Sequence, residues 1–154
     1  MPDFFVLVRR FQSFDTFTLP GNPSKLPMKT VISTAAAPAA IGPYSQGIAV
    51  GSLVFCSGQI PLDPATGELI NGDIGARTER VLKNLAAVLE AHGIGLSHVV
   101  KTVVFLTDLT DFGAMNSVYA KFFPERPPAR STIQVAALPK GANIEIEAVA
   151  VKPS

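Results

Sequence analysis

The sequence contains little cysteine, histidine or charge, and each shortage excludes a class of function. Its one cysteine, Cys56, cannot form a disulfide within the chain, which fits a reducing compartment. The two histidines, His92 and His98, do not stand at the spacing from Cys56 that zinc ligands require. The glycines form no motif of the kind that cradles phosphate groups. We therefore expect neither a metal site nor a nucleotide-binding loop.

Charge is also scarce and evenly balanced. Charged residues make up 16% of the 154 residues, the net charge is +1, and Arg9-Arg10 is the one adjacent basic pair. A nucleic-acid-binding protein normally carries a basic face or stripe, so that function is disfavoured. No apolar run reaches the roughly 18 residues that a membrane-spanning helix needs. Because 47% of this small chain is hydrophobic, part of its surface is expected to be covered in an oligomer.

The length fits one domain, preceded by a segment of different composition. Residues 1–27 are rich in phenylalanine, and a regular pattern begins only at Met28. In a secretory signal, positive charge precedes the apolar stretch, whereas here Asp3 comes first and Arg9-Arg10 follows. We interpret residues 1–27 as an extension or an upstream start, residues 28–154 as the domain, and the location as cytoplasmic. The alternative is a transit peptide for mitochondria or plastids.

Hydrophobic periodicity predicts an α+β domain. Apolar residues at helical spacing predict a helix from the Asp73 N-cap to a stop at Gly93. They predict a second helix over 111–123, capped by Thr110, with a buried face formed by Phe112, Met115, Tyr119 and Phe122. Alternating and β-branched runs predict strands over 46–50, 53–57, 99–106, 130–135 and 143–151. Two amphipathic helices can then pack on one face of a mixed sheet.

Arg130 is the leading candidate for ligand binding. Pro127 and Pro128 make a stiff, extended approach, so that Arg130 opens a strand and shares one face with Thr132 and Gln134. We expect Arg130 to lie beside the polar side of the last strand, which bears Glu145, and to form an anion-binding site there. A guanidinium group is always charged and binds a carboxylate through two parallel hydrogen bonds. The alternative is an ion pair of Arg130 with Glu145 or Glu147 and no ligand.

Other polar residues near predicted strand ends and turns could complete a pocket. Glu145 lies on the polar side of the last strand and could act as a general base or orient a water molecule; otherwise it is a rim charge. Tyr44 follows a rigid Gly42-Pro43 turn and could wall a pocket or simply pack. Asn116 could bind a ligand or a loop carbonyl. We interpret Cys56 as a buried, unreactive thiol.

Several segments together resemble the signature motifs of the RidA/YjgF family, also called the endoribonuclease L-PSP family. The resemblance extends from about Ser33 to Lys152 and leaves residues 1–27 outside. The matching segments are Pro38–Gly47, Ser57–Pro61, Val100–Leu106, Asp108–Phe112, Pro128–Ser131 and Ile144–Ala148.

The resemblance implies a chorismate-mutase-like α+β fold and a homotrimer with three sites between subunits. It also implies a cofactor-free hydrolase that converts small 2-imino acids, such as 2-iminobutanoate and 2-iminopropanoate, to 2-keto acids and ammonia. Such imines arise from pyridoxal-phosphate enzymes and can damage them. Arg130 matches the carboxylate-binding arginine of the family and Glu145 its water-orienting glutamate. The matching pocket positions are Tyr44, Ser57, Asn116 and Thr132.

Thr132 departs from the family pattern, because many members have a cysteine there whose main chain contacts the ligand. The threonine excludes a thiol role at this position. Two other functions remain open. One is an endoribonuclease, the other family label, although the low charge disfavours it. The other is a non-enzymatic module that binds small carboxylates or acts as a chaperone.

Overall fold

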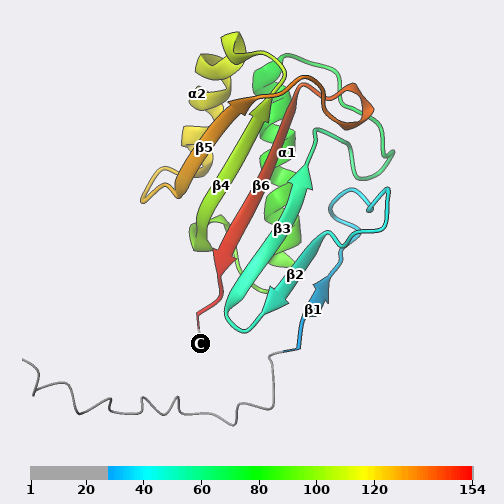
Figure 1. Cartoon of the computed structure of the whole chain (residues 1–154), viewed down its shortest axis with the longest axis vertical. Helices are drawn as coiled ribbons and strands as arrows, with labels where there is room; N and C mark the ends of the chain where they lie inside the picture. The colour runs from blue at the N-terminus through cyan, green and yellow to red at the C-terminus, as the bar shows by residue number, and fades with distance from the viewer. Residues whose placement is uncertain (1–27, 154) are drawn as a thin grey trace, which may run out of the picture.

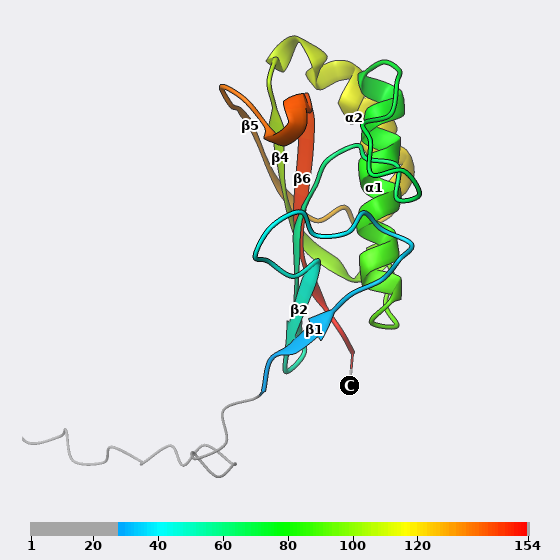
Figure 2. The same ribbon diagram turned by 90° about the vertical axis from the view of Figure 1, so that its right-hand side faces the viewer.

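The computed structural model describes residues 28–153, so the predicted extension over residues 1–27 lies outside the described part (Figure 1). Within residues 28–153, one six-stranded sheet carries two helices on one face and leaves the other face open (Figure 2). The predicted α+β layers are therefore confirmed. The elements are β1 (Thr30–Ile32), β2 (Gly47–Val50), β3 (Leu53–Gln59), α1 (Ile74–Glu90), β4 (Val99–Leu106), α2 (Phe112–Phe122), β5 (Ala129–Gln134) and β6 (Ile144–Val151).

The order of strands across the sheet is β1-β2-β3-β6-β4-β5. The last strand, β6, is thus inserted between β3 and β4 and runs antiparallel to both. Strands β4 and β5 are parallel and are connected through α2, while β5 forms the edge of the sheet. In this register Arg130 lies beside Thr102, and Thr102 lies beside Ala148.

The core lies between the sheet and the helices. The predicted apolar stripe of α1 is fully buried at Val81, Leu82 and Leu85 and faces β3 and β6. Along β6 the inward-facing side chains are Ile144, Ile146, Ala148 and Ala150, all of them buried. This strict alternation leaves Glu145, Glu147, Val149 and Val151 on the open face, as the sequence pattern predicted.

The second helix and the first strand differ from expectation. Strand β1 was not predicted, because three residues give too short a pattern. Thr110 does not cap α2: a short 3₁₀ turn over Leu109–Asp111 precedes the helix, and Asp108 accepts the Thr110 backbone N–H at 2.8 Å. Phe112 is 40% exposed, so the predicted buried face is wrong at this position. Met115 and Tyr119 are buried as predicted.

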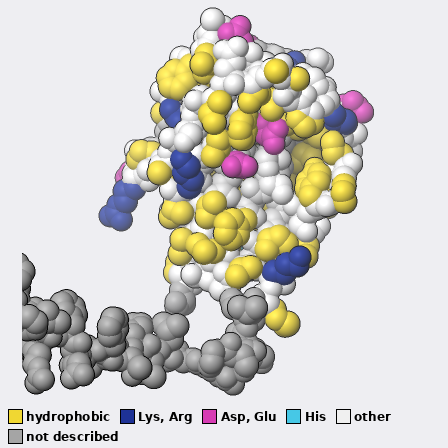
Figure 3. Space-filling model, viewed as in Figure 1, with side chains coloured by type: hydrophobic (Ala, Val, Ile, Leu, Met, Phe, Trp, Pro, Cys, Tyr) yellow, Lys and Arg dark blue, Asp and Glu magenta, His cyan; other side chains and the backbone are white. Residues whose placement is uncertain are grey.

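The open face of the sheet carries exposed hydrophobic side chains with acidic groups among them (Figure 3). Phe55 is 45% exposed and Ile133 47% exposed, and the strand registers turn both away from the helices. None of the helices within residues 28–153 is both long and apolar enough to pass through a bilayer. An apolar sheet face of this kind is typical of a surface that another protein chain covers.

The start of α1 provides a test of the local structure. The Asp73 carboxylate accepts the Ala76 backbone N–H at 2.8 Å, so Asp73→Ala should lower the free energy of unfolding by about 1 kcal/mol. The measurement is urea unfolding at fixed protein concentration. Glu79→Ala on the same helix removes only an exposed pair with Lys83 and should cost less. Equal losses in the two variants would contradict the capping role.

Candidate active site

The two leading candidates, Arg130 and Glu145, lie on opposite faces of the sheet in one chain. Arg130 is aligned with the buried Thr102 and points to the side covered by α2. Glu145 is aligned with Phe105 and points to the open face. The predicted arrangement of Arg130 beside the polar side of the last strand is therefore wrong within one chain. The alternative, an Arg130 ion pair with Glu145 or Glu147, is also absent from residues 28–153.

Helix α2 holds the Arg130 side chain with one stripe of residues. Asn116 accepts a hydrogen bond from Arg130 Nη2 at 2.8 Å. The Arg130 Cζ atom lies 4.6 Å from the Tyr119 ring centroid and 5.6 Å from that of Phe112. Asn116 thus binds the arginine, a partner that the sequence did not suggest. The other N–H groups of the Arg130 fork make no hydrogen bond within residues 28–153, so they are available to a carboxylate.

Thr132 shares the Arg130 face of β5, as strand alternation predicted. Arg130 and Thr132 are half-buried, whereas the alternate residues Ser131 and Ile133 are exposed on the opposite face. The Thr132 hydroxyl is buried and has no hydrogen-bond partner in the described part of the chain. Gln134 is aligned with the buried Leu106 and so shares this face, as predicted. It is exposed at the strand end, where its Oε1 accepts the Leu109 backbone N–H at 3.2 Å.

Glu145 lines a cavity of about 380 Å³ on the open face. Its carboxylate lies directly over Gly58: a methyl group built on Gly58 would overlap the Glu145 side chain. Gly58 therefore allows the glutamate to lie flat against β3. The cavity brings together three predicted site residues, Tyr44, Ser57 and Glu145, with a mostly apolar surround. The remaining lining residues are Ile41, Gly58, Ile60, Pro139 and Glu147.

Burial raises the pKa of the Glu145 carboxyl above its ordinary value, and the negative charge of Glu147 raises it further. Glu147 is two residues along the same strand, so both side chains point to the same face. A carboxylate with a raised pKa is a better proton acceptor than an ordinary glutamate. The position and the environment both suit Glu145 to bind and deprotonate a water molecule.

The loop that carries Tyr44 is pinned by a buried amide that sequence reasoning did not single out. Gln46 is 4% exposed, and its Nε2 donates to the backbone carbonyl groups of Ala37 and Pro38 at 3.2 and 2.8 Å. Its Oε1 accepts the Thr34 backbone N–H at 2.6 Å. The Ser57 hydroxyl donates to the Ser45 carbonyl at 2.6 Å, so Ser57 also anchors this loop. In the sequence, the only feature that points to Gln46 is its position in the Pro38–Gly47 motif.

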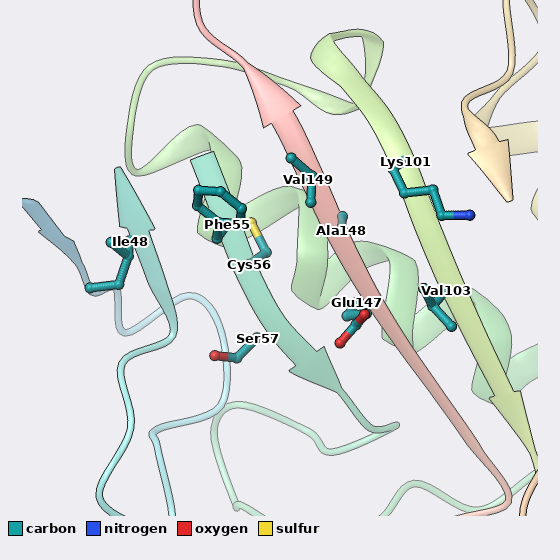
Figure 4. Close-up of a pocket in the computed structure, with 9 residues that line it drawn as sticks. All are labelled: Ile48, Phe55, Cys56, Ser57, Lys101, Val103, Glu147, Ala148 and Val149. Carbon is teal, nitrogen blue, oxygen red and sulfur yellow. The ribbon is translucent and has the colours of Figure 1, made fainter. Parts of the chain in front are cut away.

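A second, smaller cavity of about 240 Å³ continues along the open face, and Ser57 and Glu147 line both cavities (Figure 4). Most of its walls are apolar, with Lys101 on β4 as its basic residue. Cys56 belongs to its lining but is itself buried, and burial raises the pKa of the thiol to about 12. A thiol in this state is unreactive near neutral pH, as predicted. No cluster of three metal-binding side chains occurs between residues 28 and 153.

The chain is similar in sequence and in structure to proteins of one known family. Residues 34–152 match the family model described as Endoribonuclease L-PSP. The chain is 54% identical over 125 residues to Protein DfrA of Myxococcus xanthus, covering 80% of this chain and 95% of that protein. It is 48% identical over 125 residues to the human 2-iminobutanoate/2-iminopropanoate deaminase, covering 81% and 91%. The crystal structure of E. coli TdcF with bound serine superposes with a TM-score of 0.77 at 46% identity, covering 80% and 99%.

Gly58→Ala should displace the Glu145 carboxylate without disturbing the fold. The added methyl group overlaps the glutamate, whose carboxylate must then move into solvent. The pKa of Glu145 should fall toward its ordinary value, which a carbon-13 NMR titration of the carboxyl group measures. Gly95→Ala is the matched control, because a methyl group there meets nothing within 4 Å. An unchanged Glu145 titration in Gly58→Ala would refute the close approach.

Glu147→Gln should lower the pKa of Glu145. The substitution removes a negative charge that disfavours a second ionised carboxylate, so Glu145 should lose its proton at lower pH. The pKa should remain above the ordinary value, because burial, the larger cause, is unchanged. The same NMR titration checks the result, and a rise in the Glu145 pKa would contradict it.

Proposed function

The chain belongs to the endoribonuclease L-PSP family, which includes the RidA/YjgF proteins, and from this premise we propose that it is a 2-imino acid deaminase. Its substrates are small 2-imino acids of the 2-iminobutanoate and 2-iminopropanoate type, which it hydrolyses to 2-keto acids and ammonia. The role is to protect pyridoxal-phosphate enzymes. Relatives that carry this activity in their names support the assignment at the level of the family.

One observation carries the proposal: Arg130 is held in place by α2 while most of its N–H groups have no partner in the described chain. A preorganised guanidinium fork suits the carboxylate of a small acid. Serine bound to the related TdcF is itself a small 2-amino acid with a carboxylate. The half-buried setting of Arg130 strengthens such a charge-assisted contact compared with one in open water.

We propose that Arg130 and Glu145 meet between two copies of the chain in a homotrimer. Within one chain they face opposite sides of the sheet. Each chain therefore carries two separate half-sites, one around Arg130 on the helix side and one around Glu145 on the open face, and neither is complete alone. The open face carries exposed apolar side chains around the Glu145 cavity, and a second copy that covers this face would bury them. If the second copy presents its β5 edge, its Arg130 reaches the cavity with Tyr44 and Glu145.

The chemistry proposed for this site is simple hydrolysis. Arg130 binds the carboxylate, and Glu145 orients a water molecule toward the carbon of the protonated imine. The water oxygen adds to that carbon while Glu145 accepts a proton, which passes to the nitrogen. The carbinolamine then loses ammonia, and its hydroxyl proton passes through Glu145 to the leaving ammonia, which gives the 2-keto acid and an ammonium ion. The protonated imine is already a good electrophile, so positioning supplies most of the acceleration and the reaction needs no cofactor.

The other site residues have supporting roles in this proposal. Tyr44 walls the substrate cavity, and Ser57 keeps the Tyr44 loop in place. Asn116 orients Arg130 through its amide oxygen. Thr132 contacts the ligand through its main chain, so the absence of a cysteine there leaves the mechanism intact. The location we propose is the cytoplasm, or a mitochondrion or plastid if residues 1–27 act as a transit peptide.

A ribonuclease activity is the second candidate, because the family description names one. Incubation of the pure protein with RNA tests it, and Arg130→Ala serves as the control for contaminating nucleases. RNA cleavage that persists in this variant at the wild-type rate comes from a contaminant or from a different site.

Arg130→Ala and Glu145→Gln should each remove nearly all imine hydrolysis while the protein stays folded and assembled. Loss of the carboxylate anchor or of the proton acceptor should each lower the rate by about 100-fold or more. A threonine dehydratase generates 2-iminobutanoate in the assay, semicarbazide traps what remains, and light scattering checks assembly. Full activity in Arg130→Ala would refute the proposed function.

A mixture of the two variants tests the site between subunits. After unfolding and joint refolding, some sites combine an intact Arg130 from one chain with an intact Glu145 from another. Random mixing restores roughly a quarter of the wild-type sites. Activity in the mixture that does not exceed that of the separate variants would contradict the shared site and leave the single-variant result standing.

A further inference from the structure

We infer that Tyr119 is a positioning residue, whose buried ring holds the Arg130 guanidinium in the orientation that binds the ligand carboxylate. This inference rests on the proposed function, because the carboxylate is the ligand proposed for Arg130. Tyr119 lies outside the cavity and does not reach the Glu145 half-site. Its effect on the reaction would pass through Arg130 alone.

The Tyr119 ring is fixed before any ligand arrives. It is 4% exposed, and its face lies 4.6 Å from Arg130 Cζ. Its hydroxyl shares a 2.7 Å hydrogen bond with the Thr102 hydroxyl, also buried. Thr102 is the residue of β4 directly beside Arg130 in the parallel ladder. The ring is thus tied to the same rung of the sheet that carries the arginine.

This attachment matters because Arg130 stands on the edge strand of the sheet. A long arginine side chain at an edge can adopt many rotamers, and fixing it on ligand binding costs conformational entropy. Asn116 restrains one nitrogen of the guanidinium. The aromatic face below the group adds an attraction that acts on the whole cation and is strongest where water is excluded. The two contacts together fix both the plane and the direction of the fork.

The contact is a cation–π interaction and not an ion pair. Burial raises the pKa of the Tyr119 hydroxyl, although the Thr102 hydrogen bond and the Arg130 charge act in the opposite direction. The phenol is therefore neutral at physiological pH. The electron-rich ring face, and not the hydroxyl, is the part that attracts Arg130.

The sharpest test changes the ring electrons and keeps the ring shape. Tyr119→Phe retains the ring and loses the Thr102 hydrogen bond, while pentafluorophenylalanine at position 119 reverses the ring quadrupole in nearly the same volume. We expect Tyr119→Phe to keep KM for the imine within about threefold of wild type and the fluorinated ring to raise KM about tenfold. The change should appear mainly in KM, because the Asn116 hydrogen bond still directs the guanidinium once the carboxylate is bound.

Pentafluorophenylalanine at Phe123 is the matched control. Phe123 is a buried neighbour of Tyr119, and within residues 28–153 the rings that make cation–π contacts with Arg130 are Phe112 and Tyr119. Fluorination there should lower stability to a similar extent and leave KM unchanged. Equal KM for the Phe and fluorinated variants at position 119 would overturn the inference. A rise in KM from fluorination at Phe123 that equals the rise at position 119 would overturn it as well.

A second readout does not depend on activity. The Arg130 Nε–H NMR signal, identified by its loss in Arg130→Ala, should be shifted upfield by the Tyr119 ring in the wild-type protein. The signal should keep this shift in Tyr119→Phe and move to the value of a free arginine side chain with the fluorinated ring. An identical Arg130 signal in the two variants overturns the inference even if the protein hydrolyses imines. If the Arg130 signal shifts as expected but the protein does not hydrolyse imines, the proposed function is refuted and the role of Tyr119 in holding Arg130 still stands.

Discussion

The alternation of side chains across β4, β5 and β6 is the constraint on which the rest of the structure depends. Consecutive residues of a strand point to opposite faces, so the ladder that places Arg130 beside Thr102 turns it toward α2. The same ladder turns Glu145 toward the open face. No side-chain rotation can bring the two groups together through a hydrogen-bonded sheet. A site that uses both must therefore take them from different chains.

Each half-site is prepared by a different physical device. On the helix side, Asn116 and two aromatic rings along α2 hold a cation that would otherwise be loose at a sheet edge. On the open face, Gly58 makes room for the Glu145 carboxylate, and Gln46 pins the loop that presents Tyr44. These contacts cost nothing at the moment of reaction, because they form during folding. The proposed mechanism, which depends on positioning more than on a strong nucleophile, requires this kind of preparation.

The sequence predicted the layers, the main elements and the orientation of β6, because these follow from hydrophobic periodicity over eight or more residues. It also identified residues that line the Glu145 cavity, through their resemblance to family motifs. The sequence did not predict features that depend on one specific side-chain contact. The Asn116–Arg130 hydrogen bond, the Gln46 amide and the Asp108 turn each depend on distances between side chains and backbone that no local pattern records. The separation of Arg130 from Glu145 required the strand order, which places β4 between their two strands.

The charge around the two half-sites favours a small acid over RNA as the ligand. An RNA strand brings a phosphate at every nucleotide and needs a continuous basic track to neutralise them. The Glu145 cavity instead has a second carboxylate, Glu147, at its wall, and the adjoining cavity offers Lys101 as its basic residue. In the proposed site between subunits, a small acid keeps its carboxylate at the Arg130 guanidinium of another copy and places only its imine carbon near Glu145. A polyanion that followed the same surface would have to pass both glutamates, and the repulsion would grow with each phosphate.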